Sequence, residues 1–213
     1  HNQISKHRWS VLVCHRRFGK TVCMINHLIR SALLSKQKNP RYAYISPTFK
    51  QSKSIAWDYM KQFTNKIPYI KFNETELRVD LPNGARITLL GSENSDGLRG
   101  IYLDGCVIDE YANVHSKLFP EIIRPALSDR KGYCVFIGTP QGMNNNFYEL
   151  YQHAQGADDW FNYKAKASET EIVDPEELVK AKEVMGEKKY LQEFECDWIA
   201  NIEGAIYNDT LVK

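Results

Sequence analysis

The residues with the clearest chemical potential lie near the start of the chain, in the segment 14–21, which reads Cys-His-Arg-Arg-Phe-Gly-Lys-Thr. An apolar run, 9–13, precedes this segment, and the pattern of residues 22–34 predicts a helix. A strand, a loop with Gly-Lys-Thr and a helix start are typical of a phosphate-binding loop, because the loop N–H groups and the positive end of the helix dipole face an anion. We expect Lys20 to reach the β- and γ-phosphates of a nucleotide and the Thr21 hydroxyl to bind Mg²⁺.

The loop departs from the usual pattern at one position. In G-x-x-x-x-G-K-[ST], Cys14 stands where the first glycine is expected. An ordinary strand-to-helix turn with a surface lysine is therefore the alternative, and the interpretation needs support from elsewhere in the sequence.

Two carboxylates follow the apolar run 105–108. Asp109 and Glu110 stand directly after this run, and ligands of open α/β sheets bind at the carboxyl ends of the strands. We predict that Asp109 holds Mg²⁺, mostly through water, and that Glu110 polarises the water that attacks the γ-phosphate. A polar strand end that only caps the next turn is the alternative.

A hydroxyl follows the next buried run, 133–137. We expect Thr139 to lie in the same crevice as Glu110, where its hydroxyl can sense a γ-phosphate, and Gln141 can act likewise. A plain strand-to-loop turn explains these residues when they are taken alone. Together with the loop and the paired carboxylates, they favour a nucleotide hydrolase over a protein that only binds nucleotide.

These segments belong to an alternation of strands and helices. Several strands are unbroken apolar runs, which favours an α/β fold with a mostly parallel sheet covered by helices on both faces. The helix 49–66 is expected to place Ile55, Tyr59 and Phe63 on one face, and residues 91–100 are expected to form an irregular loop. The other predicted strands are 42–46, 70–72, 76–81, 85–90 and 160–167, and the other predicted helices are 118–127, 146–153, 175–185 and 188–196.

The composition indicates a globular chain without a strong overall charge. Its 213 residues, 43% of them hydrophobic, suit one α/β domain with a small appended subdomain. A net charge of +2 means that any contact with a polyanion must be local. The five cysteines are scattered and lack C-x-x-C spacing, which fits a reducing compartment. Neither a signal peptide nor a membrane-spanning apolar stretch is visible.

Taken together, the motifs resemble the ATPase domain of the large terminase subunits of tailed phages, the motors that pump DNA into procapsids. The resemblance implies a P-loop NTPase of the ASCE or RecA-like type, with Mg²⁺-dependent hydrolysis of ATP. It covers nearly the whole chain, and it is carried by the segments 15–21, 97–100, 107–112, 137–140 and 190–207.

The same resemblance divides the chain into parts. Residues 1–167 are expected to form the ATPase core, residues 168–203 a lid subdomain, and residues 204–213 the start of a linker to a nuclease domain. Trp160, Tyr163 and Trp198 are expected in the core of the lid. Because the chain begins with His1 and ends without an acidic cluster, we expect a piece of a longer protein, and nuclease activity only in the full-length protein.

The resemblance also accounts for the irregular loop. Terminases commonly lack the first glycine and carry an arginine inside the loop, and Arg16 matches that arginine. Its guanidinium would join Lys20 in neutralising a triphosphate and can move between phosphate and a partner carboxylate. Gln3 is similar to the adenine-reading glutamine of the family. The implied nucleotide-binding residues are Gln3, Arg17, Phe18, Gly19, Lys20 and Thr21.

Ring ATPases of this class also supply an arginine to the nucleotide of a neighbouring subunit. Arg99, in a glycine-flanked loop, is predicted to reach phosphate either in its own subunit or in a neighbour, and Arg78 and Arg86 are alternatives. A loop arginine that pairs with Asp96 or Asp104 is the other interpretation of Arg99.

The ligands implied by the resemblance are ATP and Mg²⁺. The implied partners are double-stranded DNA, further copies of the chain in a homo-oligomeric ring, the portal protein and the small terminase subunit, and no membrane. The implied location is the cytoplasm of the host cell, and the protein is not expected in the virion. DNA contact is the least visible of these in the residues. A ring can concentrate modest subunit charge into a basic pore, although solvated helix faces explain most of the lysines equally well. The scattered cations are Lys36, Lys38, Arg41, Lys50, Lys53, Lys61 and Lys66.

Two other functions share some of these motifs. A DNA helicase or translocase has a similar loop, Asp-Glu pair and threonine, but it needs a second RecA-like domain, for which too few residues follow Pro140. A single domain of a truncated helicase is therefore the main alternative. A nucleotide-binding module without hydrolysis would be expected to have lost Lys20, Asp109 or Glu110.

Overall fold

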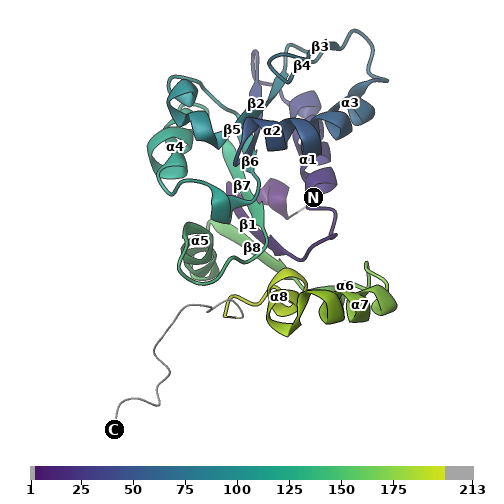
Figure 1. Cartoon of the computed structure of the whole chain (residues 1–213). Helices are drawn as coiled ribbons and strands as arrows, with labels where there is room; N and C mark the ends of the chain where they lie inside the picture. The colour runs from purple at the N-terminus through teal and green to yellow at the C-terminus, as the bar shows by residue number, and fades with distance from the viewer. Residues whose placement is uncertain (1–2, 200–213) are drawn as a thin grey trace.

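The computed structural model describes residues 3–199, except for the side chains of residues 95–97, and an eight-stranded sheet runs through them (Figure 1). The strand order is β3-β4-β5-β2-β6-β7-β1-β8. From β5 to β8 all neighbours are parallel, whereas β3, β4 and β5 pair antiparallel. The strands are β1 Trp9–Cys14, β2 Arg41–Ser46, β3 Lys71–Asn73, β4 Arg78–Asp80, β5 Arg86–Gly91, β6 Gly105–Ile108, β7 Tyr133–Gly138 and β8 Trp160–Ala165.

Helices alternate with these strands, as the sequence predicts. Two of the helical segments, η2 and η5, are π-helices, while η1, η3 and η4 are 3₁₀ turns. The helical segments are η1 Ile4–Lys6, α1 Lys20–Leu34, α2 Phe49–Gln51, η2 Ser52–Trp57, α3 Asp58–Thr64, η3 Ser92–Leu98, η4 Tyr111–Asn113, η5 Leu118–Ile123, α4 Arg124–Ala126, α5 Asn146–Gln155, α6 Ala167–Thr170, α7 Pro175–Met185 and α8 Glu187–Glu193.

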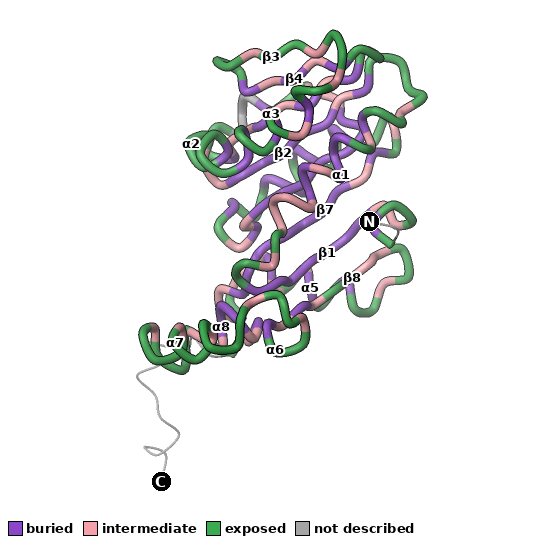
Figure 2. The backbone as a smooth tube through the Cα atoms, turned by 90° about the vertical axis from the view of Figure 1, so that its right-hand side faces the viewer, coloured by how far each residue is buried: buried purple, intermediate pink, exposed green. Residues whose placement is uncertain are grey.

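Hydrophobic cores lie on both faces of the sheet, which confirms the predicted α/β class. On one face, Leu28 of α1 packs in a cluster with Val107 of β6. On the other face, Ile123 of η5 and Phe147 of α5 pack in a cluster with Phe136 of β7. Because successive side chains of a strand point to opposite faces, a strand covered on both sides must be apolar throughout. The central strands are accordingly buried along their length (Figure 2).

The helical segment 49–66 differs from the prediction in its buried face. Its middle turn, η2, is a π-helix, and this wider turn rotates the residues that follow it. Trp57 and Met60 are buried, whereas Ile55 and Tyr59 are 45% and 39% exposed. Tyr59 and Phe63 stack at 5.9 Å, in line with the predicted shared face, but Ile55 and Tyr59 do not belong to the buried side of the segment.

The segment 91–100 also differs, because it is more regular than a loop. Residues Ser92–Leu98 form 3₁₀ turns, which are broken at Asn94 by a non-helical backbone. The chain is tight where this segment begins, since a β-carbon at Gly91 would overlap the Glu93 side chain and the Phe49 N–H.

The helices α6, α7 and α8 lie together at one end of the molecule (Figure 1). α7 has no buried residue and contacts α8. Trp160 and Trp198 do not form a core for this group, because Trp160 stacks on Trp9 and Trp198 packs on Phe147 in the main core. Tyr163 is 43% exposed. The expected lid core of Trp160, Tyr163 and Trp198 is therefore wrong.

The proposed division at residues 167, 203 and 213 stays a prediction. Residues 200–213, which include the expected linker and the end of the expected lid, lie outside the described residues. Within the described part of the chain, no helix is long and apolar enough to span a bilayer.

Candidate functional site

The carboxyl ends of β1, β7 and β6 bring the three predicted motifs together. β7 lies between the other two strands, with Val13 of β1 beside Gly138 and Ile108 of β6 beside Phe136. The loop 15–19, Thr139 and the Asp109-Glu110 pair each follow one of these strands. They therefore lie side by side at one edge of the sheet, where ligands of open α/β sheets bind.

The loop between β1 and α1 makes its turn with two left-handed residues. Arg17 has φ 68° and Gly19 has φ 85°. At Gly19 a side chain would be strained, since left-handed backbone favours glycine. No described side chain caps the first turn of α1, and the first N–H groups of a helix have no partner within the helix. This combination is suited to an anion.

Lys20 is the first residue of α1, and its ammonium group lies inside the loop. It donates to the carbonyl oxygens of Cys14, at 3.2 Å, and His15, at 3.4 Å. Burial raises the pKa of both Asp109 and Glu110, and the charge of Lys20 opposes that rise in each. Lys20 thus connects the loop electrostatically to the carboxylates at the end of β6.

Asp109 is a buried carboxylate with fixed partners. Its Oδ1 accepts the N–H of Glu110 at 2.9 Å, and its Oδ2 accepts the hydroxyl of Tyr44. The Tyr44 hydroxyl also interacts with the Thr21 hydroxyl. Burial raises the pKa of Asp109, and the Tyr44 bond and the Lys20 charge act in the opposite direction. Tyr44 therefore links the two predicted magnesium ligands.

Glu110 is half-buried and has a left-handed backbone, with φ 47° and ψ 48°. The turn packs closely on the end of β7, since a β-carbon at Gly138 would lie 3.6 Å from the Glu110 Cα. Burial raises the pKa of Glu110, as does the charge of Asp109, while Lys20 and Arg16 lower it. A carboxylate with a raised pKa is a better proton acceptor, which suits a general base.

Two oxygen-bearing side chains, those of Asp109 and Thr21, could hold a magnesium ion. Within the described residues, no group of three or more histidine, cysteine, aspartate or glutamate side chains could hold a metal by itself. Mg²⁺ characteristically takes one or two carboxylates and completes its shell with phosphate oxygens and water. The donor set, with its buried carboxylate at Asp109, fits that ion in the company of a nucleotide.

Arg16 extends from the loop to α8. Its N–H donates to the Glu193 carbonyl at 2.8 Å, and its Nη1 lies 3.7 Å from the Glu193 Oε2. The Arg16 side chain is 61% exposed, so this ion pair contributes little to stability. Glu193 also binds Lys189 at 3.0 Å, and its charge adds to the burial that raises the pKa of Glu110. Arg16 therefore has a carboxylate partner near the predicted base.

His15 is fully buried and binds the loop to α6. Its Nδ1 lies 2.6 Å from the Arg16 carbonyl oxygen, and its Nε2 lies 2.8 Å from the Thr170 Oγ1. Because a carbonyl oxygen only accepts, Nδ1 carries the proton, and Nε2 accepts the Thr170 hydroxyl. Burial lowers the pKa of His15, which keeps the ring neutral.

α8 also reaches the loop that follows β7. The Gln192 side chain is fully buried, and its Nε2 donates to the Pro140 carbonyl at 2.6 Å. Pro140 directly follows Thr139, which is itself buried. The segment α6–α8 therefore holds both the phosphate-binding loop and the Thr139 turn. Gln141 is half-buried and its carbonyl accepts the side-chain amide of Asn145.

A cavity of about 560 Å³ opens beside the loop. It contains Gln3 and Phe18, which the sequence predicts to bind nucleotide, together with Tyr163 of β8. The rings of Phe18 and Tyr163 are 6.4 Å apart. Ligand pockets of this size accept small molecules and are typically apolar with a few polar groups. The cavity is suited to a planar base next to the phosphate site.

Arg99 and its two alternatives, Arg78 and Arg86, line a cavity or pair with residues outside this crevice. Arg99 lines a cavity of about 410 Å³ with Glu121 and Asp129. Arg78 and Arg86 each form an ion pair with Asp80, at 3.2 and 2.6 Å. The cations that act on Glu110 are Lys20 and Arg16, both from the loop.

Sequence reasoning missed several side chains of the site. Tyr44 carried a visible signal, because a tyrosine near the end of a buried strand must place its hydroxyl on a partner. Thr170, Gln192 and Glu193 carried no local signal, since their partners are far away in the sequence. The Thr170 bond, for example, spans 155 positions.

Comparison with known proteins places most of the chain in one family. Residues 14–212 match the family described as "Terminase large subunit, T4likevirus-type, N-terminal". The terminase large subunits of Thermus phage G20c and Thermus virus P23-45 are each 40% identical over 60 residues, which is 28% of this chain. This match spans only 12% of the length of each relative.

Solved structures share the fold at low sequence identity. The ATPase domain of the Thermus phage P74-26 large terminase superposes with a TM-score of 0.76 at 19% identity, covering 91% of this chain and 89% of that one. The large terminase of another thermophilic bacteriophage, solved in complex with ATP-gamma-S, has a TM-score of 0.76 at 13% identity, covering 92% of this chain and 49% of that one.

Proposed function

Since the chain belongs to the T4-like N-terminal family of terminase large subunits, we propose that it hydrolyses ATP and so drives double-stranded DNA into a procapsid. The observation that carries the hydrolysis is the meeting of Lys20 with Asp109 and Glu110 at one edge of the sheet, where the lysine charge acts on both carboxyls. A loop with a lysine suits phosphate binding, and a base beside it suits attack by water.

We assign each step of this reaction to a residue of the site. The loop N–H groups and Lys20 bind the β- and γ-phosphates, and Arg16 adds a second cation to the loop. Glu110 accepts the proton of the attacking water, helped by its raised pKa. Thr139, which is buried and follows the glycine that packs on the Glu110 turn, contacts the γ-phosphate or the water. The cavity beside Gln3 and Phe18 receives the adenine.

A bound Mg²⁺ would neutralise charge on the phosphates, and the residues that would hold it are Asp109 and Thr21. Tyr44 keeps the Asp109 carboxylate oriented, because its hydroxyl donates to Oδ2. Arg16 pairs with Glu193, and its charge also acts on Glu110. A third cation, Arg99, lines a separate cavity, so we propose that any contact it makes with phosphate is at the nucleotide of a neighbouring subunit.

The partners and the location proposed for this chain are inferred from its relatives rather than from its own residues. The phi-28 gp11 structure, described as a DNA packaging motor, shares the fold with a TM-score of 0.53 at 11% identity. We propose double-stranded DNA, a homo-oligomeric ring, a portal protein and a small terminase subunit as partners, in the cytoplasm of the host cell. A nuclease domain is proposed only for the full-length protein. No feature of the described residues favours the helicase alternative over this one.

The test compares Lys20→Ala with Lys188→Ala, which removes an exposed lysine of α8. Thermal unfolding with and without Mg²⁺–ATP reports binding, and phosphate release reports hydrolysis. We expect Lys20→Ala to lose the stabilisation by ATP and at least 100-fold of the turnover, while Lys188→Ala keeps both. Turnover that survives in Lys20→Ala at the wild-type rate would refute the proposed site.

A further inference from the structure

A row of cations lies at the edge of the sheet opposite the nucleotide crevice. Arg41 begins β2, Arg8 precedes β1, and Arg130 and Lys131 precede β7. These strands are parallel, so their starts meet at one edge, and the loop that leads from α1 to β2 lies there as well. The set, here called the basic edge, is Arg8, Lys36, Lys38, Arg41, Arg130 and Lys131.

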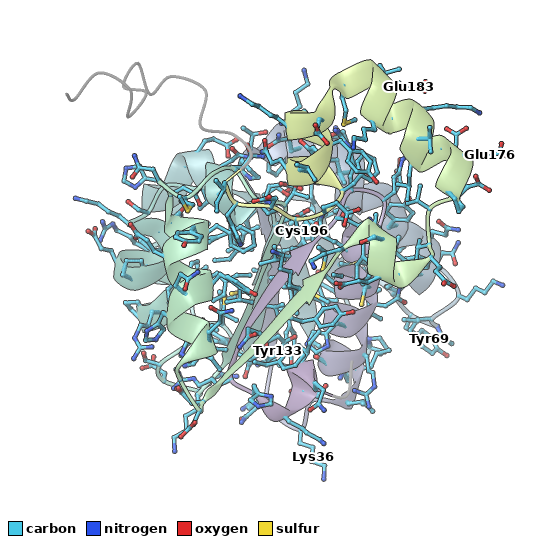
Figure 3. All side chains as sticks on the ribbon, turned by 90° about the horizontal axis from the view of Figure 1, so that it is seen from below. Lys36, Tyr69, Tyr133, Glu176, Glu183 and Cys196 are labelled. Carbon is cyan, nitrogen blue, oxygen red and sulfur yellow. The ribbon has the colours of Figure 1, made fainter. Side chains whose placement is uncertain are left out.

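The basic edge lies far from the helices that flank the nucleotide crevice. In Figure 3, Lys36 points outward at one end of the molecule, while Glu183 of α7 lies at the other end. The strands β1 and β7 each have six residues, or roughly 20 Å at 3.3 Å per residue. ATP would therefore bind at one end of these strands and the basic edge would face outward at the other.

Several contacts hold the arginines of this edge in place. Arg130 donates to the Lys38 carbonyl at 3.0 Å, and its guanidinium lies 4.1 Å from the centre of the Tyr102 ring. The guanidinium of Arg41 lies 5.9 Å from the centre of the same ring. Arg8 donates to the Gly132 carbonyl at 3.0 Å. A guanidinium has five N–H donors, so each arginine keeps donors for a further ligand.

Direct ion pairs involve little of this charge. Within the described part of the chain, Arg130 is the one member of the basic edge with an ion pair, and its partner Asp104 lies 3.5 Å away with its side chain 6% exposed. Lys36, Lys38 and Lys131 are exposed. By contrast, Lys61 on α3 is paired with Asp58 and Glu74. Of the scattered cations of the sequence, Lys36, Lys38 and Arg41 thus belong to the basic edge, whereas Lys61 is paired with two carboxylates.

We infer that the basic edge is the surface on which this chain contacts the phosphate backbone of double-stranded DNA, an inference that rests on DNA being the substrate of the proposed motor. From β2 to β1 the edge crosses three strand spacings, or roughly 14 Å. Over that length one strand of B-DNA carries about four phosphates. Lysines and backbone-held arginines suit contacts to phosphate that ignore base sequence.

The test removes three exposed lysines of the basic edge, in Lys36→Gln/Lys38→Gln/Lys131→Gln. The matched control, Lys50→Gln/Lys53→Gln/Lys188→Gln, removes three exposed lysines from α2, η2 and α8 and changes the net charge equally. Fluorescence anisotropy with a labelled duplex of mixed sequence measures the affinity between about 50 and 200 mM salt. The logarithm of the binding constant falls with the logarithm of the salt concentration, with a slope of about 0.9 for each phosphate contact.

For the basic-edge variant we expect at least a tenfold loss of affinity at about 50 mM salt. The slope of the logarithm of the binding constant against the logarithm of the salt concentration should decrease in magnitude by roughly 2 to 3. The control should stay within about twofold of wild type, and both variants should release phosphate from ATP at the wild-type rate. Equal losses in the two variants, or a larger loss in the control, would overturn the inference. A wild-type chain that does not bind the duplex at all would overturn the inference together with the DNA part of the proposed function.

Discussion

The bond between His15 and Thr170 offers a sharp test of how the phosphate-binding loop is held. Replacing Thr170 by valine keeps the shape of the side chain and removes the hydroxyl that donates to the His15 Nε2 at 2.8 Å. The ring then keeps its bond to the Arg16 carbonyl at 2.6 Å but has a buried acceptor without a donor.

The magnitude follows from burial. His15 is 0% exposed, so water cannot replace the lost donor. An unsatisfied buried polar group costs about 1–3 kcal/mol, and in a chain of this size about 1 kcal/mol lowers Tm by roughly 2–4 °C. We expect Thr170→Val to reduce the free energy of unfolding by about 2 kcal/mol and Tm by about 4–8 °C.

Urea and thermal unfolding at pH 7.5 measure the loss, and Thr170→Ser is the matched control because it keeps the hydroxyl. We also expect weaker binding of ATP in Thr170→Val, since the His15 ring positions the loop through the Arg16 carbonyl. If Thr170→Val and Thr170→Ser unfold at the same urea concentration, the hydroxyl does not support His15, and the tautomer assigned to the ring is wrong.

Three further predictions concern other buried polar groups. Burial lowers the pKa of His27 to about 4, so the unfolded chain takes up the proton first as the pH falls below about 6.5. The free energy of unfolding should therefore drop by about 2 kcal/mol between pH 7 and pH 5. In urea titrations His27→Leu should reduce this loss of stability at low pH, and an unchanged loss would exclude His27 as its source. Because burial raises the pKa of Asp109, Asp109→Asn should raise the free energy of unfolding at pH 7 by about 1 kcal/mol without nucleotide, and a lower Tm would show that the carboxylate is net stabilising. Gln192→Leu leaves the Pro140 carbonyl without its donor at 2.6 Å and should cost about 1–3 kcal/mol in thermal unfolding, whereas an unchanged Tm would mean that the bond is not needed.

The parts of the fold that the sequence predicts well depend on local signals. β6 runs from Gly105 to Ile108 and α7 from Pro175 to Met185, both with the predicted bounds. The strand is a short apolar run that ends at two carboxylates. The helix starts with a capping aspartate, Asp174, whose side chain accepts the Glu176 N–H, and a proline at its first position. Such signals lie within a few residues of the element that they define.

The parts that could not be predicted depend on packing. The segment 49–66 contains a π-helical turn, and Ala56 and Trp57 of that turn are buried in the core together with Met60 of α3, whereas Ile55 and Tyr59 are exposed. The period of the apolar residues alone gives no sign of the extra residue in that turn. Trp160 and Trp198 likewise pack on β1 and α5, whereas α7 has no buried residue against which a large ring could pack.

The candidate site divides in the same way. Lys20, Asp109 and Glu110 could be placed from the sequence because each belongs to a short motif that directly follows a predicted strand. The residues that orient them could not be placed, since the Tyr44–Asp109 bond spans 65 positions and the Gln192–Pro140 bond spans 52. Long-range partners of this kind are fixed only when the sheet and the helices have packed.

Hydrolysis at Glu110 is the central claim, and the comparison of Glu110→Gln with Glu121→Gln tests it most directly. Glutamine keeps the size of the side chain and removes the base, while Glu121 is an exposed glutamate of η5 that does not belong to the crevice. Phosphate release and ATP-dependent thermal stabilisation are measured on each protein. We predict that Glu110→Gln binds ATP like the wild type but releases phosphate at least 100-fold more slowly, whereas Glu121→Gln behaves as wild type. Wild-type phosphate release by Glu110→Gln would contradict the account.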